Sequence, residues 1–147
     1  MRRIRLTSGD VALVDNELFR ALSKYTWSLC SGYAQTKNGI RMHRLVINAQ
    51  KGTMVDHINR NRLDNRKENL RLCTMQENRR NSAKKKGSAS PFKGVMRVTH
   101  RPAWRAFIKY DDKNHYLGYF KSEVEAAQAY NEAAKEHFGE FAVLNQI

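Results

Sequence analysis

The segment VDHINRNRLDNRKENLRLCT, residues 55–74, places several candidate catalytic side chains on one short stretch of chain. Asp56 and His57 are adjacent, Asn69 follows twelve residues after His57, and Asn78 follows nine residues later. Carboxylate and amide oxygens suit a hard divalent cation such as Mg²⁺, and a histidine can act as a general base near neutral pH. With basic residues all around them, these groups are typical of a site that hydrolyses phosphodiester bonds.

The residues that flank this segment predict strands on its N-terminal side and a helix on its C-terminal side. The run IRMHRLVI, residues 40–47, is predicted to be a strand. Thr74 and Glu77 have the spacing of a capping box, so a helix is expected over residues 75–83. Farther upstream we expect a short helix or turn over 14–25, and short strands over 3–6, 11–14 and 25–36.

Residues 55–78 resemble the HNH nuclease motif, the ββα-metal finger of nicking and homing endonucleases. The run RMHRLVI before them looks like the segment that leads into this finger in phage-type members. The resemblance implies that His57 is the general base, that Asp56 and Asn78 bind the metal, and that Asn69 holds the loop so that His57 is aimed. Many members carry His where this chain has Asn78. An oxygen ligand there favours Mg²⁺ or Mn²⁺ over zinc.

Each of these residues also has a structural interpretation. Asp and Asn side chains often bond local backbone in turns and caps, and a histidine can be an inert surface residue. Asn81 lies three residues after Asn78 on the predicted helix and is an alternative to it. His43 is interpreted as a packing or phosphate-contacting residue, and Asn65 as part of the loop structure.

The C-terminal part of the chain predicts three strands followed by one helix. The strands are FKGVMRV, WRAFIKY and HYLGYF, with turns at THRP and DDKN. Ser122 and Glu125 form a second capping-box pattern, which begins an Ala-rich helix over residues 123–138, and Gly139 has the position of a C-terminal cap. In WRAFIKY, small and branched residues that suit packing on this helix alternate with Arg105, Phe107 and Lys109.

Residues 90–145 resemble the AP2 DNA-binding domain in KGV, W-x-A-x-I, YLGYF, the EAAxAYxxAA helix and the final FG-x-x-A-x-x-N. In that family a three-stranded sheet lies in the major groove and the helix braces its back. Met96, Val98, Phe107 and Asn114 depart from the best-known plant pattern, so the plant target sequence does not carry over. The candidate DNA contacts are Lys93, Arg97, Arg101, Arg105, Lys109 and Tyr116, together with Arg79 and Arg80 of the first module.

Composition and charge agree with two small modules that act on a polyanion. The 147 residues carry a net charge of +13, of which residues 1–89 carry +12 and residues 90–147 carry +1. No run approaches the roughly 18 apolar residues of a membrane span. Cys30 and Cys73 form no CxxC pair, which argues for a reducing, intracellular setting without a structural zinc or disulfide.

The sequence therefore predicts an α+β protein: a ββα-metal HNH nuclease module with N-terminal strands over 1–82 (finger about 40–82), a basic flexible linker over 83–90 and a βββα AP2-like domain over 91–147. The predicted activity is that of a site-specific, homing-type endonuclease that uses Mg²⁺ or Mn²⁺ and nicks one strand of double-stranded DNA. We expect it in the cytoplasm of a bacterial or phage-infected cell, without membrane or small-molecule cofactor. The alternatives are a non-catalytic DNA-binding transcription regulator and an RNA-binding accessory protein.

Overall fold

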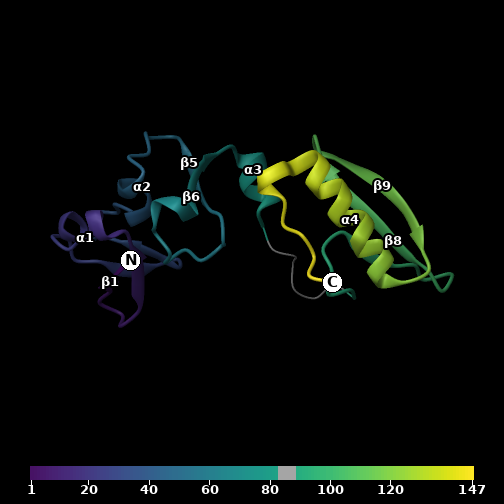
Figure 1. Cartoon of the computed structure of the whole chain (residues 1–147), viewed down its shortest axis with the longest axis horizontal. Helices are drawn as coiled ribbons and strands as arrows, with labels where there is room; N and C mark the ends of the chain where they lie inside the picture. Colours follow the sequence, from purple (N-terminus) through teal and green to yellow (C-terminus); the bar gives the residue numbers. More distant parts are fainter. Residues whose placement is uncertain (83–88) are drawn as a thin grey trace. The chain divides into compact units, whose positions relative to one another are not determined.

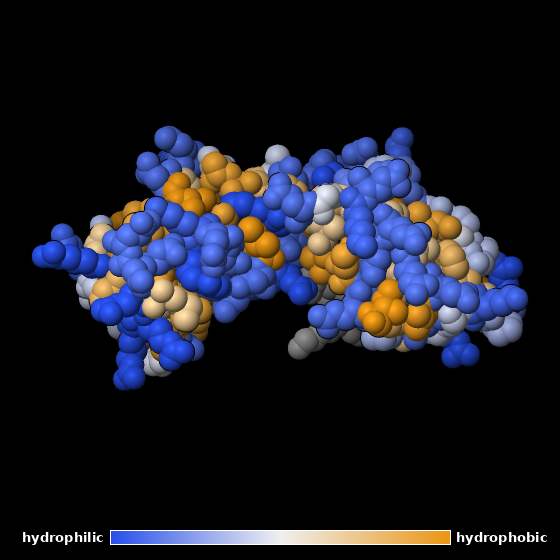
Figure 2. All heavy atoms as spheres, in the orientation of Figure 1, coloured by the Kyte–Doolittle hydropathy of each residue, from blue (hydrophilic) through white to orange (hydrophobic). Residues whose placement is uncertain are grey.

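The computed structural model describes residues 1–82 and 89–147, so that residues 83–88 of the predicted linker lie outside the described residues. The chain divides into two compact units, Met1–Asn78 and Arg79–Ile147 (Figure 1). In the described ranges no helix is long and apolar enough to cross a membrane. Hydrophilic side chains cover much of the face shown in Figure 2, in keeping with the net charge of +13.

The first unit consists of three small antiparallel sheets and short helices. Each sheet pairs two consecutive strands: β1 (Arg2–Arg5) with β2 (Val11–Val14), β3 (Ser28–Cys30) with β4 (Tyr33–Gln35), and β5 (Met54–His57) with β6 (Leu70–Cys73). The helices are α1 (Asn16–Leu22), α2 (Met42–Val46), the 3-10 helix η1 (Lys67–Asn69) and α3 (Met75–Arg80), which runs across the border between the units.

The loop that follows β5, residues 58–66, is attached to the core of the first unit through strand β2. Val14, Trp27 and Met42 are almost completely buried in this core, and the Trp27 indole donates a hydrogen bond of 2.8 Å to the Leu22 carbonyl. Strand β2 is bonded to the loop in both directions, because Leu13 N–H donates to the Leu63 carbonyl and Asn65 N–H donates to the Leu13 carbonyl. The loop is therefore attached to the core of the unit.

The prediction of a strand over residues 40–47 is wrong, because this segment forms helix α2. Met42 and Val46, four residues apart, both face the core, which is the spacing of a helix. A short apolar run cannot be assigned to helix or strand by periodicity alone. The predicted strand over 25–36 is instead the β3–β4 hairpin, and the helix predicted over 75–83 ends at Arg80.

The second unit is a three-stranded antiparallel sheet covered on one face by helix α4, as Figure 1 shows. The strands are β7 (Val95–Arg97), β8 (Trp104–Tyr110) and β9 (Lys113–Phe120), in this order in the sheet; α4 (Glu123–Phe138) leads into the 3-10 helix η2 (Gly139–Phe141). The expected βββα order is therefore present. The capping box of Ser122 and Glu125 is confirmed in both directions.

Close packing of the helix on the sheet explains why several residues of the second unit are small. Alanines at 126, 127 and 134 are completely buried against the sheet side that carries Ala106 and Ile108. Gly94 has a φ of +74°, and a Cβ there would lie 2.6 Å from the Phe107 carbonyl oxygen, so a side chain is excluded.

The opposite face of the sheet is not covered by α4, and the strand register defines which residues form it. Directly paired residues of antiparallel strands share a face. One row consists of Met96, Arg105 and Tyr119; further along, Phe107 pairs with Tyr116, and Lys109 with Asn114. We call these seven residues the open face; its Met96, Tyr116 and Tyr119 are about half exposed.

Candidate active site

The β5–β6 hairpin carries Asp56 and His57 on opposite faces. Asp56 pairs with Arg71, and His57, the last residue of β5, pairs with Leu70. Successive residues of a strand point to opposite sides, so His57 shares its side with the buried core residue Leu70. Both side chains are buried, and they lie on opposite sides of β5.

The Asp56 carboxylate forms an ion pair with Arg71. Its Oδ2 accepts hydrogen bonds from Arg71 Nε at 3.1 Å and from Nη2 at 3.0 Å. On the same side, burial raises the pKa of the Cys73 thiol, and the negative charges of Asp56 and Glu77 raise it further. A carboxylate, a guanidinium and a neutral thiol thus meet on this side of the hairpin.

His57 lies in a small aromatic cluster. Its ring centroid is 5.1 Å from that of His43, edge to face, and 5.9 Å from that of Tyr33. Burial is the largest influence on the imidazole and holds the pKa of His57 below 6.5, and the charge of Arg62 acts in the same direction. The hydrogen bond to Asn65 and the charges of Asp56 and Asp64 oppose this shift. The imidazole is therefore neutral at pH 7, as a proton acceptor must be.

Asn65 sets which nitrogen of His57 carries the proton. Its amide Nδ2 donates to the Leu63 carbonyl at 3.2 Å, which turns Oδ1 toward His57 Nε2 at 3.4 Å. Because Oδ1 is an acceptor, we assign the proton to Nε2 and the basic lone pair to Nδ1. From the sequence alone, Asn65 is interpreted only as loop structure. The position of its amide depends on the tertiary bond between Asn65 and Leu13, which spacing along the chain does not reveal.

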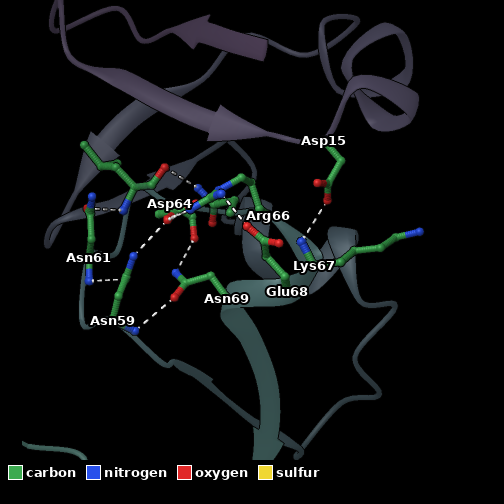
Figure 3. Close-up of polar contacts among 10 residues, drawn as sticks. Asp15, Asn59, Asn61, Asp64, Arg66, Lys67, Glu68 and Asn69 are labelled. Atoms are coloured by element: carbon green, nitrogen blue, oxygen red, sulfur yellow. Dashed lines mark hydrogen bonds and ion pairs between the residues drawn. The ribbon is translucent and has the colours of Figure 1, made fainter. Parts of the chain in front are cut away.

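The loop between β5 and η1 is held by a network of polar side chains around the buried Asp64 and Asn69 (Figure 3). Asn69 spans the loop, because its Oδ1 accepts from the Asn59 N–H at 2.9 Å and its Nδ2 donates to the Asp64 carbonyl at 2.8 Å. The Asp64 carboxylate accepts from Asn59 Nδ2 at 2.8 Å and from Arg66 Nε and Nη2 at 2.8 and 2.7 Å. These hydrogen bonds hold the pKa of Asp64 below 3.8, and those from Arg66 have the largest effect.

Asn78 lies on α3, which follows directly after β6. The predicted capping box at the start of this helix is confirmed, because Thr74 N–H donates to Glu77 Oε2 and Glu77 N–H donates to Thr74 Oγ1. Asn78 itself is exposed, whereas Asn81 is buried and belongs to the second unit. Within residues 1–82 and 89–147 no three His, Cys, Asp or Glu side chains gather as a metal site.

Several of the predicted DNA contacts have partners within the chain. Lys93 Nζ donates to the carbonyls of Arg80 and Ser82, both at 2.8 Å, and the Arg80 guanidinium lies 4.9 Å from the Phe138 ring. Arg97 pairs with Trp104 and so lies on the side of the sheet that carries α4, away from the open face. For Arg97 this follows from the register of β7 on β8, which the sequence alone does not contain.

The other predicted contacts are close to or on the open face. Arg105 and Lys109 belong to it, with Tyr116 between their rows. The guanidinium of Arg101 lies 3.5 Å from the Tyr119 ring centroid, and Arg105 Nη2 lies 3.1 Å from Met96 Sδ. Arg79 is exposed on α3. Arg101 and Arg105 thus lie beside exposed apolar side chains of the open face.

Comparisons with known proteins agree with the geometry of the first unit. The family model described as HNH endonuclease matches residues 41–80, which include β5, β6 and α3. The chain is 35% identical over 148 residues to an uncharacterized HNH endonuclease of Acanthamoeba polyphaga mimivirus, covering 95% of this chain and 76% of that protein. It is also 35% identical over 65 residues to Protein 3.8 of Escherichia phage T7, covering 44% and 54%. HNH nucleases generally use a divalent metal ion. The chain belongs to the HNH endonuclease family and is a DNA-cleaving hydrolase.

Proposed function

We propose that this protein is a metal-dependent endonuclease that nicks one strand of double-stranded DNA at a preferred site. The observation that carries the proposal is the His57–Asn65 pair: a buried, neutral imidazole whose Nε2 is held by an amide oxygen. In this arrangement His57 Nδ1 takes the proton from the attacking water. Asn65 fixes the tautomer of His57, and Asn69 keeps the loop that carries Asn65 in place.

Asp56 and Asn78 are the residues that would hold the cation. They provide one carboxylate and one amide oxygen, a donor set that suits Mg²⁺ or Mn²⁺. Because Mg²⁺ keeps several of its waters, two protein ligands leave room for water and a phosphate oxygen. When bound, the ion stabilises charge on the phosphate and on the departing oxygen. Arg71 holds the Asp56 carboxylate in a fixed position in the hairpin.

Supercoiled plasmid tests the proposed activity. We expect conversion to the nicked circle with Mg²⁺ or Mn²⁺ and no conversion with EDTA, because one finger per chain favours cutting one strand, whereas a dimer could cut both. Linear DNA as the first product would contradict nicking. Cleavage in EDTA would contradict the metal requirement. DNA binding without cleavage in any of these ions, on plasmids that carry diverse bacterial and phage DNA, would favour the transcription regulator.

The second unit is proposed to bind the target DNA as an AP2-like domain. The βββα order, the exposure of the open face and its Arg105 and Lys109 support this role. Guanidinium groups can donate two hydrogen bonds to a guanine edge in the major groove, and the tyrosine rings offer apolar contact to thymine methyl groups. We also propose a homing-type role in a bacterial or phage-infected cell. The partial similarity to a phage protein supports this setting.

Replacing Arg105 with alanine is expected to weaken binding to the preferred site by about tenfold or more, since a bidentate contact contributes about 1–3 kcal/mol of discrimination. Lys135→Ala is the matched control, because Lys135 is an exposed cation on α4, away from the open face. Gel-shift titration in EDTA measures both affinities without cleavage. Equal affinities of the two variants would show that the open face does not contact DNA.

A further inference from the structure

Two arginines lie against one tyrosine ring in the first unit. The guanidinium carbons of Arg41 and Arg62 are 4.8 and 4.7 Å from the centroid of Tyr33. Both arginines are exposed, and in the described part of the chain neither forms an ion pair, whereas Arg66 and Arg71 are paired with Asp64 and Asp56. Arg41 and Arg62 thus keep their charge available to an anion from outside.

Both side chains are held in place by further contacts. Arg62 Nη1 donates to the Ser31 carbonyl at 3.0 Å, in the turn of the β3–β4 hairpin, and Arg41 Nε donates to Gln35 Oε1 at 3.4 Å. Cation–π contact with Tyr33 adds to this restraint. Since an ordered side chain loses less conformational entropy when it binds, the pair is preorganised for a ligand.

The position of the pair next to the general base indicates which ligand it takes. The Tyr33 ring contacts His57 and also His43, at a centroid distance of 5.0 Å. The Tyr33 ring therefore contacts both guanidinium groups and both histidines of the cluster around His57. His43 is buried, and its Nδ1 has no hydrogen-bond partner among the described residues. An acceptor that enters this region would find two charged donors and one neutral polar atom.

We propose that Arg41 and Arg62 form a clamp for one backbone phosphate of the cleaved strand, a phosphate that flanks the one attacked at His57. This inference rests on the proposed nuclease function and adds two positioning residues to it. Guanidinium–phosphate hydrogen bonds are charge-assisted and short. A flanking phosphate keeps its charge through the reaction, so the clamp acts on DNA binding and register more than on the chemical step.

The experiment combines variants of the clamp with changes in single DNA phosphates. In the Arg41→Gln/Arg62→Gln double variant, each side chain loses its charge and keeps most of its aliphatic stem; Arg20→Gln removes an exposed charge from α1 and is the control. A duplex obtained by binding selection is made with one neutral methylphosphonate at a time. Dissociation constants are measured in EDTA for every position, and the nick is mapped separately in Mg²⁺ or Mn²⁺.

We expect one position, within a few nucleotides of the nick, where the methylphosphonate weakens binding of the parent and of Arg20→Gln by about tenfold. The same methylphosphonate should leave the double variant unaffected, and the variant should show a smaller salt dependence of binding. We call a position silenced when its methylphosphonate weakens binding of the parent but not of the double variant. The clamp would be overturned if every methylphosphonate weakened binding of the two proteins equally, or if the silenced position lay far from the nick. A silenced position on DNA that the parent never cleaves would keep the phosphate contact and overturn the nuclease function.

Discussion

Replacing His57 with alanine is expected to reduce the nicking rate by about 10²–10⁴-fold and to leave DNA affinity within about twofold. The loss follows from removing the proton acceptor, whose contribution in general base catalysis has this size. Affinity should persist because the proposed DNA contacts of the open face lie in the second unit. The measurements are single-turnover nicking in Mg²⁺ or Mn²⁺ and gel-shift titration in EDTA.

Burial of His57 makes the choice of controls important. Its ring packs against His43 and Tyr33, so the alanine variant leaves a cavity and lowers the stability of the first unit as well. His57→Gln fills more of this space and still lacks a base, and it should be as inactive as the alanine variant. His100→Ala removes an exposed histidine of the second unit and should nick at the parental rate. Parental nicking by both His57 variants would refute its assignment as the base.

The features predicted correctly from the sequence are those that depend on neighbouring residues. Both capping boxes form where Thr74 and Ser122 precede a glutamate by three positions, because the bonds involve only that turn. The long helix α4 matches residues 123–138, since its buried residues repeat at helical spacing from Ala126 to Phe138. These features form through contacts between residues that are close in sequence, so the local pattern is enough to predict them.

Features that depend on pairing and tertiary contact were missed. The register of β7 on β8 decides that Met96, and not Arg97, shares the open face with Arg105. Helix α2 forms over a run that is equally compatible with a strand, because Met42 and Val46 complete the core. Asn65 reaches His57 only because its backbone is bonded to Leu13, which lies 52 residues earlier in the chain. Contacts of this kind join segments that are distant in sequence or depend on strand register, so the spacing of residues along the chain does not predict them.

Replacing Asp64 with alanine is expected to lower the unfolding free energy of the first unit by about 3 kcal/mol. The carboxylate is buried and accepts two hydrogen bonds from Arg66 and one from Asn59. Its loss leaves these donors without their acceptor, and breaking a buried pair in this way costs about 3–5 kcal/mol when both partners are fully buried. The partly exposed Arg66 reduces the cost, because water can solvate the guanidinium.

Glu68→Ala is the matched control for this prediction. Glu68 also pairs with Arg66, but 70% of its side chain is exposed. Surface ion pairs contribute about 0–1 kcal/mol, so this variant should remain close to the parent. Denaturant unfolding of the full chain, followed by Trp27 fluorescence in a Trp104→Phe background, reports on the first unit alone. Equal stabilities of the two variants would show that the Asp64 network does not stabilise this unit.

The same network makes the stability of the first unit sensitive to acid. Because the Arg66 and Asn59 hydrogen bonds lower the pKa of Asp64, the folded unit binds this proton less readily than the unfolded chain does. The stabilisation is complete above 3.8, the ordinary pKa of the carboxyl group, and is lost as the pH falls below that value through the lowered one. The difference in unfolding free energy between the parent and Asp64→Ala should therefore be full at pH 7 and shrink as the pH falls below 3.8. A difference that stays constant down to pH 2 would show that the buried charge of Asp64 contributes nothing, and that the loop beside His57 is held by its neutral hydrogen bonds.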